Sequence, residues 1–137
     1  MAARGVHFSL TKKMAAKLLR ADSDEALMEL VEDIESDWDE AHLVESDKAW
    51  DAIHRCLTDG QLHYDGGEPP LNRVICGGRQ LHQGEDYTIS FVSADEVQEV
   101  ARALVPLDEA WLRTRYFAML DPREYDGQIS EDDFGYT

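Results

Sequence analysis

The chain has 137 residues, of which 43% are hydrophobic and 31% charged, and these proportions predict a soluble globular domain rather than a disordered or fibrous chain. No apolar run approaches the roughly 20 residues that a membrane span needs, and the first residues lack the apolar stretch of a secretory signal, so we expect a cytoplasmic protein. The formal net charge of -16 disfavours direct binding to DNA or RNA, whose phosphates are recognised through Lys and Arg.

Short alternating and helical patterns predict the first two elements. Val6, Phe8 and Leu10 alternate with polar residues, which is typical of a half-buried strand. Thr11 is a suitable N-cap for a helix that continues to Arg20, because its hydroxyl can accept from a free backbone N–H of the first turn.

Ser23 is a suitable N-cap for a second helix, in which apolar side chains form one stripe and acids cover the rest. The stripe comprises Leu27, Leu30, Val31, Ile34 and Trp38, and the acids are Asp24, Glu25, Glu29, Glu32, Asp33 and Glu35. Residues 21–51 hold 13 acids and one base, a local net charge of -12. We expect this acidic block to be mainly the solvated face of the helix, followed by a loop over residues 40–45.

A third helix is predicted after this loop, with Ser46 or Asp47 as its cap and Asp59-Gly60 at its end. Its apolar side carries Ala49, Trp50, Ile53, His54 and Leu57. Residues 61–70 are rich in Gly, Pro and polar side chains and predict a long surface loop. A short helical turn over residues 71–75 is then expected to end at Gly77-Gly78, where a left-handed conformation is easily adopted.

The second half of the chain predicts one strand and two helices. Tyr87, Ile89 and Phe91 alternate with polar residues as in a strand. Ser93 and Asp108 are suitable N-caps, and the two helices are expected to end at Pro106 and at Asp121-Pro122. These elements together predict an α+β fold over residues 1–137, a single helix-rich domain with a small sheet. All three tryptophans are expected in the core, and one of them could line a pocket.

Residues 47–60 (DKAWDAIHRCLTDG), followed by Pro70-Leu71, Val74-Ile75, Gly77-Gly78 and residues 97–104, resemble the YfbM-like family of uncharacterised bacterial proteins. The opening Gly5-Val6-His7-Phe8 and the closing residues 130–134 fit the same pattern. The resemblance implies a compact α+β domain and no established activity. Relatives of this type usually continue past the position of Thr137 with a helix and a strand, so we expect either a shorter member or a chain that is missing its C-terminal segment.

His54 is the first candidate for catalysis, because an imidazole can act as an acid, a base or a ligand and several acids are close to it in sequence. It shares the apolar side of its predicted helix with Trp50 and Leu57, so a buried histidine that fixes packing is the favoured interpretation. Cys56 lies about 200° away from His54 around a helix and cannot pair with it. Neither this cysteine nor Cys76 predicts a disulfide in a protein that is not exported.

A small-molecule site, if present, is expected where the end of the third helix faces the glycine pair across a cleft. The candidate ligand-binding residues are Trp50, His54, Thr58, Asp59, Gly77 and Gly78, with Arg55 or Arg79 available to hold an anion. The glycine pair by itself favours a helix end, because neither a P-loop lysine nor a dinucleotide fingerprint accompanies it. The sequence predicts no cofactor and, for want of ligand spacing among its histidines, cysteines and acids, no metal site.

Two functions of different classes follow. The first, which we favour, is a non-enzymatic acidic interaction protein, immunity-like or regulatory, that presents the helix over residues 24–37 to a basic protein partner. Its candidate contact residues are Glu29, Glu32, Asp33 and Asp37. The alternative is a small-molecule-binding domain or an enzyme with a pocket around His54. The sequence leaves the choice between a monomer and a dimer open.

Overall fold

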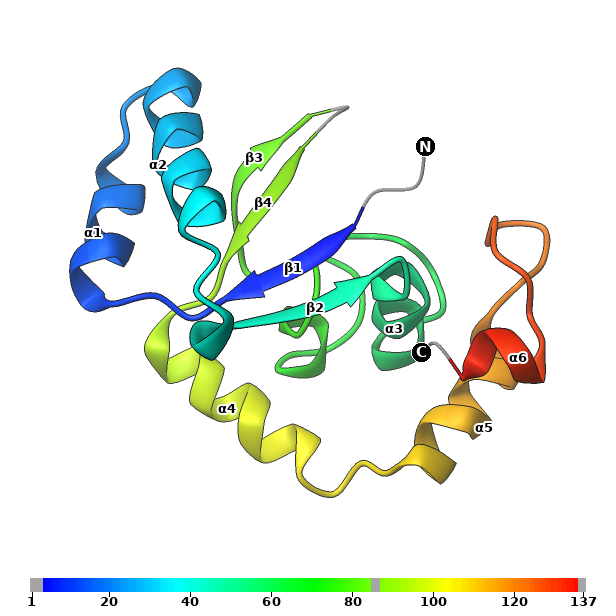
Figure 1. Ribbon diagram of the computed structural model, residues 1–137. Coiled ribbons are helices and arrows are strands. Elements are labelled where there is room, and N and C mark those ends of the chain that lie inside the picture. Colours follow the sequence, from blue (N-terminus) through cyan, green and yellow to red (C-terminus); the bar gives the residue numbers. More distant parts are fainter. Residues whose placement is uncertain (1–3, 85–86, 136–137) are drawn as a thin grey trace. The chain divides into compact units, whose positions relative to one another are not determined.

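The computed structural model describes residues 4–84 and 87–135. Over these residues the chain forms six α-helices, two short 3-10 helices and four strands in two small sheets. Figure 1 labels the α-helices and the strands. The α+β fold class predicted from the sequence is confirmed.

The backbone divides into two compact units. Residues 6–46 form the smaller unit, and residues 1–5 with residues 47–137 form the larger one. The expectation of one domain over residues 1–137 stays a prediction.

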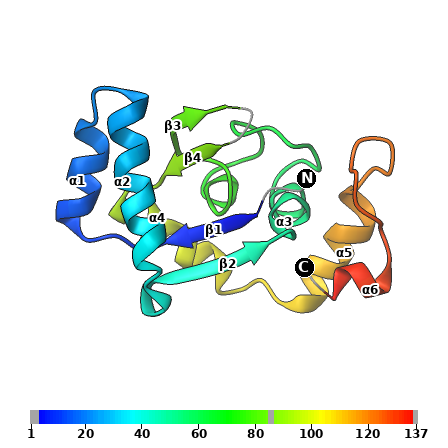
Figure 2. The same ribbon diagram turned by 45° about the horizontal axis from the view of Figure 1, so that its top comes forward.

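The smaller unit contains a helical pair and a two-stranded sheet. Helices α1 (Lys12–Arg20) and α2 (Asp24–Asp37) lie side by side (Figures 1 and 2). Both predicted caps are confirmed, because Thr11 accepts from the Met14 N–H at 3.1 Å and Ser23 accepts from the Ala26 N–H at 3.1 Å. The strands are β1 (Gly5–Phe8) and β2 (Leu43–Asp47), which pair with each other and run in opposite directions in Figure 2.

The expected loop over residues 40–45 is wrong. This segment forms a 3-10 helix, η1 (Glu40–His42), and the beginning of β2. Strand β2 alternates poorly in hydropathy and carries two acids, and its pairing partner lies far away in the sequence. The Ser9 N–H donates to the His42 carbonyl at 2.7 Å and the His7 ring bonds the Ser46 hydroxyl at 2.8 Å, contacts that no local pattern predicts.

Helix α3 (Trp50–Leu57) opens the helical part of the larger unit. The prediction that Ser46 or Asp47 caps it is wrong, because both residues belong to β2 and the residue at the N-cap, Ala49, has no capping side chain. The predicted loop over residues 61–70 is confirmed, and a 3-10 helix, η2 (Leu71–Arg73), follows it.

Strands β3 (Arg79–Gln83) and β4 (Thr88–Phe91) form an antiparallel pair with a bulge between Gln80 and His82. Only the second of these strands was expected. The predicted helical turn does not reach the glycine pair, since it ends at Arg73, whereas Gly78 has a positive φ of 93° and leads into β3.

Three further helices complete the larger unit: α4 (Ala94–Leu104), α5 (Glu109–Met119) and α6 (Glu131–Phe134). Ser93 and Asp108 cap α4 and α5 as predicted, and Ser93 forms a reciprocal capping box with Glu96. The four-residue helix α6 was not expected in the acidic stretch near the end of the chain.

The core of the larger unit lies where α3, α5 and α6 meet. Its buried members are Ala52, Cys56, Tyr116, Leu120 and Phe134. The Tyr116 hydroxyl, inside this core, donates to the Gln128 carbonyl at 2.9 Å, so its one polar group is satisfied. The packing fixes α3, the element that carries the candidate residues Trp50, His54 and Arg55.

Candidate functional site

The acidic face of α2 is exposed as predicted. Glu29, Glu32, Asp33 and Asp37 are all exposed side chains, and in residues 4–84 and 87–135 none of them forms an ion pair. The apolar stripe on the opposite side is covered, with Leu27 buried and Leu30, Val31 and Ile34 half-buried. Four uncompensated carboxylates therefore lie along one helix surface.

Trp38 lies at the end of this acidic face. The expectation that it is a core residue is wrong. It follows the last residue of α2 and adopts the left-handed conformation, with φ 42° and ψ 55°, while its N–H donates to the Ile34 carbonyl. The indole stands edge-on to the Phe8 ring at 6.0 Å between centroids and keeps 38% of its surface exposed. A tryptophan is uncommon in this backbone conformation, which usually takes Gly or Asn.

His54 lies in the core of the larger unit with no exposed surface. Its Nε2 donates to the His63 carbonyl at 2.8 Å, which ties the loop after α3 to the helix. Nδ1 is buried and, in the part of the chain that the structure describes, has no hydrogen-bond partner. A ring that solvent does not reach and that holds a backbone carbonyl has the geometry of a packing residue.

Arg55 is also held by contacts within the protein. Its side chain is 7% exposed, its Nε donates to Asp51 Oδ1 at 2.6 Å, and its guanidinium lies over the Tyr125 ring. The expectation that it is available to hold an anion is wrong, because the carboxylate of Asp51 already occupies it. The other arginine named for that role, Arg79, is exposed.

The two cysteines are buried free thiols. Burial raises the pKa of Cys56 to about 11 and that of Cys76 to about 12, although the nearby Arg115 opposes the rise at Cys56. Both therefore remain protonated near neutral pH and lack the thiolate that a nucleophile needs.

Arg115, on α5, holds the C-terminal end of α3. Its Nε donates to the Cys56 carbonyl at 2.9 Å and its Nη2 donates to the Thr58 carbonyl at 2.6 Å, while the Thr58 hydroxyl donates to the His54 carbonyl at 2.7 Å. These bonds satisfy carbonyls that a helix leaves free at its end. Beside them lies a pocket of about 470 Å³ lined in part by Thr58, Asp59, Trp111 and Arg115. Trp111 is thus a tryptophan that lines a pocket.

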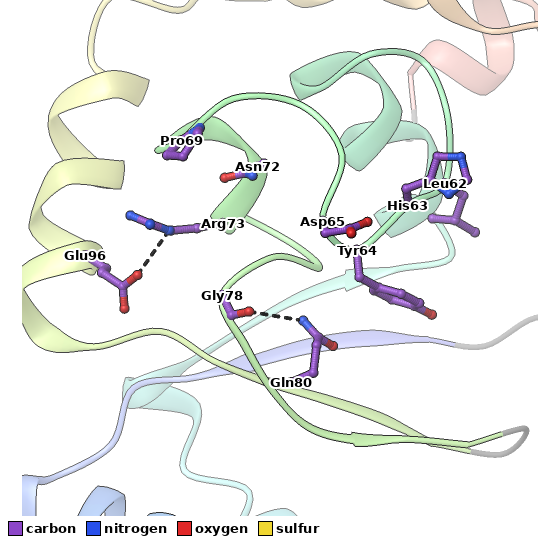
Figure 3. A pocket seen from close by; sticks show the side chains of 10 residues that line it. All are labelled: Leu62, His63, Tyr64, Asp65, Pro69, Asn72, Arg73, Gly78, Gln80 and Glu96. Carbon is purple, nitrogen blue, oxygen red and sulfur yellow. Dashed lines mark hydrogen bonds and ion pairs between the residues drawn. The ribbon is translucent and has the colours of Figure 1, made fainter.

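A larger pocket of about 690 Å³ lies between the loop after α3 and the segment from η2 to α4, and Figure 3 labels the ten residues that line it. Arg73 reaches Glu96 on α4 at 3.0 Å, and the Glu99 carboxylate lies 3.6 Å from its guanidinium. Hydrogen bonds from Ser93 and the charge of Arg73 hold the pKa of Glu96 below its usual value, so this carboxyl is ionised.

The structure does not gather all of the predicted ligand-binding residues in one pocket. Thr58 and Asp59 line the smaller pocket and Gly78 lines the larger one, whereas Trp50, His54 and Gly77 line neither of the two. A Cβ on Gly77 would lie 2.0 Å from the Asn72 carbonyl oxygen, so this glycine is required by a close backbone approach.

Apart from Gly78, sequence reasoning missed the residues that line the larger pocket. Leu62, His63, Tyr64 and Asp65 belong to the segment that was assigned only as a surface loop. The signal that could have found the pocket is the end of the Gly- and Pro-rich segment at Pro69-Pro70. Asn72 and Arg73 follow it and place two polar side chains in the next turn.

No helix among the described residues has the length and apolarity to cross a membrane. Within the same residues, no three His, Cys, Asp or Glu side chains group closely enough to hold a metal ion.

Comparison with known proteins gives a family match. The model of a family described as "Domain of unknown function (DUF1877)" matches residues 1–136. Neither a search of curated proteins nor a search of solved structures gives a significant match.

Proposed function

The chain belongs to the DUF1877 family, a domain of unknown function, and on that premise we propose that it is a non-enzymatic acidic interaction protein that binds a basic protein partner. The binding surface is the exposed face of α2 with Trp38 at its end. The partner meets it in the cytoplasm, in an immunity-like or regulatory role. The assignment to the YfbM-like proteins of bacteria is part of the same proposal.

The observation that carries the proposal is a row of carboxylates without cation partners. Glu29, Glu32, Asp33 and Asp37 are exposed along α2, and no Lys or Arg in the described residues pairs with them. Such a surface attracts a basic protein and accelerates its association, because the long-range field orients the encounter.

Trp38 supports the proposal with a feature that solubility alone does not require. Large aromatic side chains are enriched among the residues that dominate binding energy at protein interfaces. Here the indole is held against Phe8 and is still 38% exposed, with Asp37 and Asp39 as its sequence neighbours. An aromatic anchor beside carboxylates suits a partner surface with Lys or Arg, which can also stack on the ring.

The test compares two triple variants with the same change in net charge. Glu29→Lys, Glu32→Lys and Asp33→Lys alter the proposed surface, whereas Glu68→Lys, Glu124→Lys and Asp126→Lys alter exposed acids of the larger unit. Proteins retained from the native cytoplasm by the wild type at low salt are identified, and their affinities are then measured with purified components. We expect the first triple variant to lose binding at least tenfold and the second to keep it.

Two results would contradict the proposal. Equal losses in both triple variants mean that only overall charge matters, and unchanged binding in the first means that α2 is not the surface. A third variant, Trp38→Ala, is expected to speed dissociation more than it slows association, since steering comes from the carboxylates and not from the ring.

A further inference from the structure

We propose that the 690 Å³ pocket of the larger unit binds a small organic cation, an alkylammonium, between the loop over residues 62–65 and the segment from η2 to α4. The inference concerns residues 47–137 and is independent of the α2 surface, which lies in the other unit. It rests on which hydrogen-bonding groups of the pocket are already used.

Among the described residues, the one Arg or Lys that lines the pocket is already bound by carboxylates. Arg73 has Glu96 at 3.0 Å and Glu99 at 3.6 Å, so two carboxylates face one guanidinium. Figure 3 shows its side chain turned toward Glu96. An anionic ligand would have to displace these carboxylates and would add to a local excess of negative charge, which disfavours phosphates and carboxylates as ligands.

Two groups of the pocket with unused capacity are acceptors. Asn72 Oδ1 is buried and has no hydrogen-bond partner in the described part of the chain. A buried acceptor without a donor destabilises the folded protein, so a donor that reaches this oxygen is favoured. Asp65, on the facing loop, is exposed and forms no ion pair among the described residues. A ligand that complements this pocket therefore donates hydrogen bonds and carries positive charge.

The remaining lining suits a short alkyl chain. Leu62, Pro69 and the Tyr64 ring contribute apolar surface. Methylene groups can lie against such side chains while an ammonium group reaches the acceptors, and an aromatic ring adds a favourable contact with a cation. An alkylammonium has both parts in one molecule.

The experiment uses three probes with the same four-carbon chain and different charge: n-butylammonium, 1-butanol and butyrate. Each is titrated into the isotope-labelled full chain while backbone amide NMR shifts are recorded. For a ligand of this size we expect a Kd of about 1 mM for n-butylammonium, with saturable shifts at residues 62–65, 72–73 and 78–80. Butanol is expected to bind at least fivefold more weakly, and butyrate to cause no saturable shift.

Two variants and two matched controls locate the cation. Asp65→Asn is expected to weaken n-butylammonium binding about tenfold, and Asn72→Leu, which removes the unpartnered oxygen, is expected to weaken it by a similar factor while the protein stays folded. Asp126→Asn and Glu124→Gln each remove one exposed acid elsewhere and should leave binding unchanged. If Asn72→Leu does not fold, Asp65→Asn and its controls decide alone.

The inference is overturned if n-butylammonium gives no saturable shift, if butyrate or butanol binds as well, or if the control variants weaken binding as much as Asp65→Asn. The last result would assign the effect to the net charge of the protein. Shifts that concentrate on residues 24–38 would overturn it as well, because the cation would then lie on α2.

Discussion

Replacing Asp51 with Ala is expected to destabilise the larger unit by about 3 kcal/mol, because it leaves the Arg55 guanidinium without its counterion. Arg55 is 7% exposed and Asp51 is 23% exposed, with 2.6 Å between Nε and Oδ1. The other oxygens that Arg55 reaches, the carbonyls of Gly60 and Glu124, lie at 3.4 and 3.5 Å and are weak acceptors at that distance.

The magnitude follows from how the two side chains are buried. Breaking a fully buried ion pair costs about 3–5 kcal/mol, and the partial exposure of Asp51 places this pair at the low end. Arg55→Met should cost less, about 2 kcal/mol, because the stranded carboxylate can turn toward water and the methionine retains much of the packing. The double variant should cost about 3 kcal/mol rather than the additive 5, which gives a coupling of about 2 kcal/mol.

The assay is urea unfolding of the four proteins of this double-mutant cycle, followed by circular dichroism. With a slope of about 2 kcal/mol per molar urea, Asp51→Ala should lower the midpoint by about 1.5 M. The coupling between Asp51 and Arg55 should persist in 0.5 M NaCl, since salt screens buried pairs weakly. The pair of Arg123 and Asp121 is more exposed, so its contribution to stability should disappear at this salt concentration. Additive single variants, or a neutral Asp51→Ala, would refute the reasoning.

Three further predictions concern single residues of the two units. Trp38→Gly should be about 1 kcal/mol more stable than Trp38→Ala, because φ is positive at this residue. Inside a helix the order of the two variants would be the reverse. Thermal unfolding of both variants checks this. Cys56 and Cys76 should resist alkylation at pH 7 until the protein is unfolded, which labelling followed by mass spectrometry checks. The free energy of unfolding should fall as the pH rises above 9, because the unfolded thiols then lose protons that the folded thiols keep. Unfolding at pH 8 and at pH 10 measures this fall. Burial lowers the pKa of His7, so the unfolded chain takes up a proton more readily and stability should fall as the pH drops below about 6.5. His7→Gln should remove that part of the pH dependence. An equal loss of stability at low pH in the variant would contradict the prediction.

The elements that could be predicted from the sequence are those fixed by neighbouring residues. Thr11, Ser23, Ser93 and Asp108 each accept from an N–H three residues ahead, so a local pattern contains both partners of the interaction. Strand β2 was missed because its partner β1 lies far away in the sequence and its own alternation is weak. The same reason explains why Ser46, a good cap by type, lies in a strand. Strand β3 pairs with the neighbouring β4, but it was missed because Leu81 is its only apolar residue and a bulge interrupts its register.

The candidate sites could be predicted only where exposure follows from helical periodicity. The acids of α2 are exposed because the apolar stripe on the same helix is covered, and both facts are contained in residues 24–37. Trp38 was misassigned because periodicity assumes that the helix continues, whereas the chain turns left-handed at that residue. The larger pocket depends on how a loop faces η2 and α4, and the unpartnered oxygen of Asn72 exists only in the folded chain.

The two hydrogen bonds from Arg115 to the end of α3 have a consequence for the order of folding. Helix α3 has eight residues, fewer than the roughly 12–15 that an isolated helix needs in water, and it begins without a capping side chain. The carbonyls at its other end are held by a guanidinium 57 and 59 residues further along the chain. During synthesis α3 therefore gains its full stability only after α5 has emerged, because a nascent chain that stops before residue 115 lacks the guanidinium that holds these carbonyls.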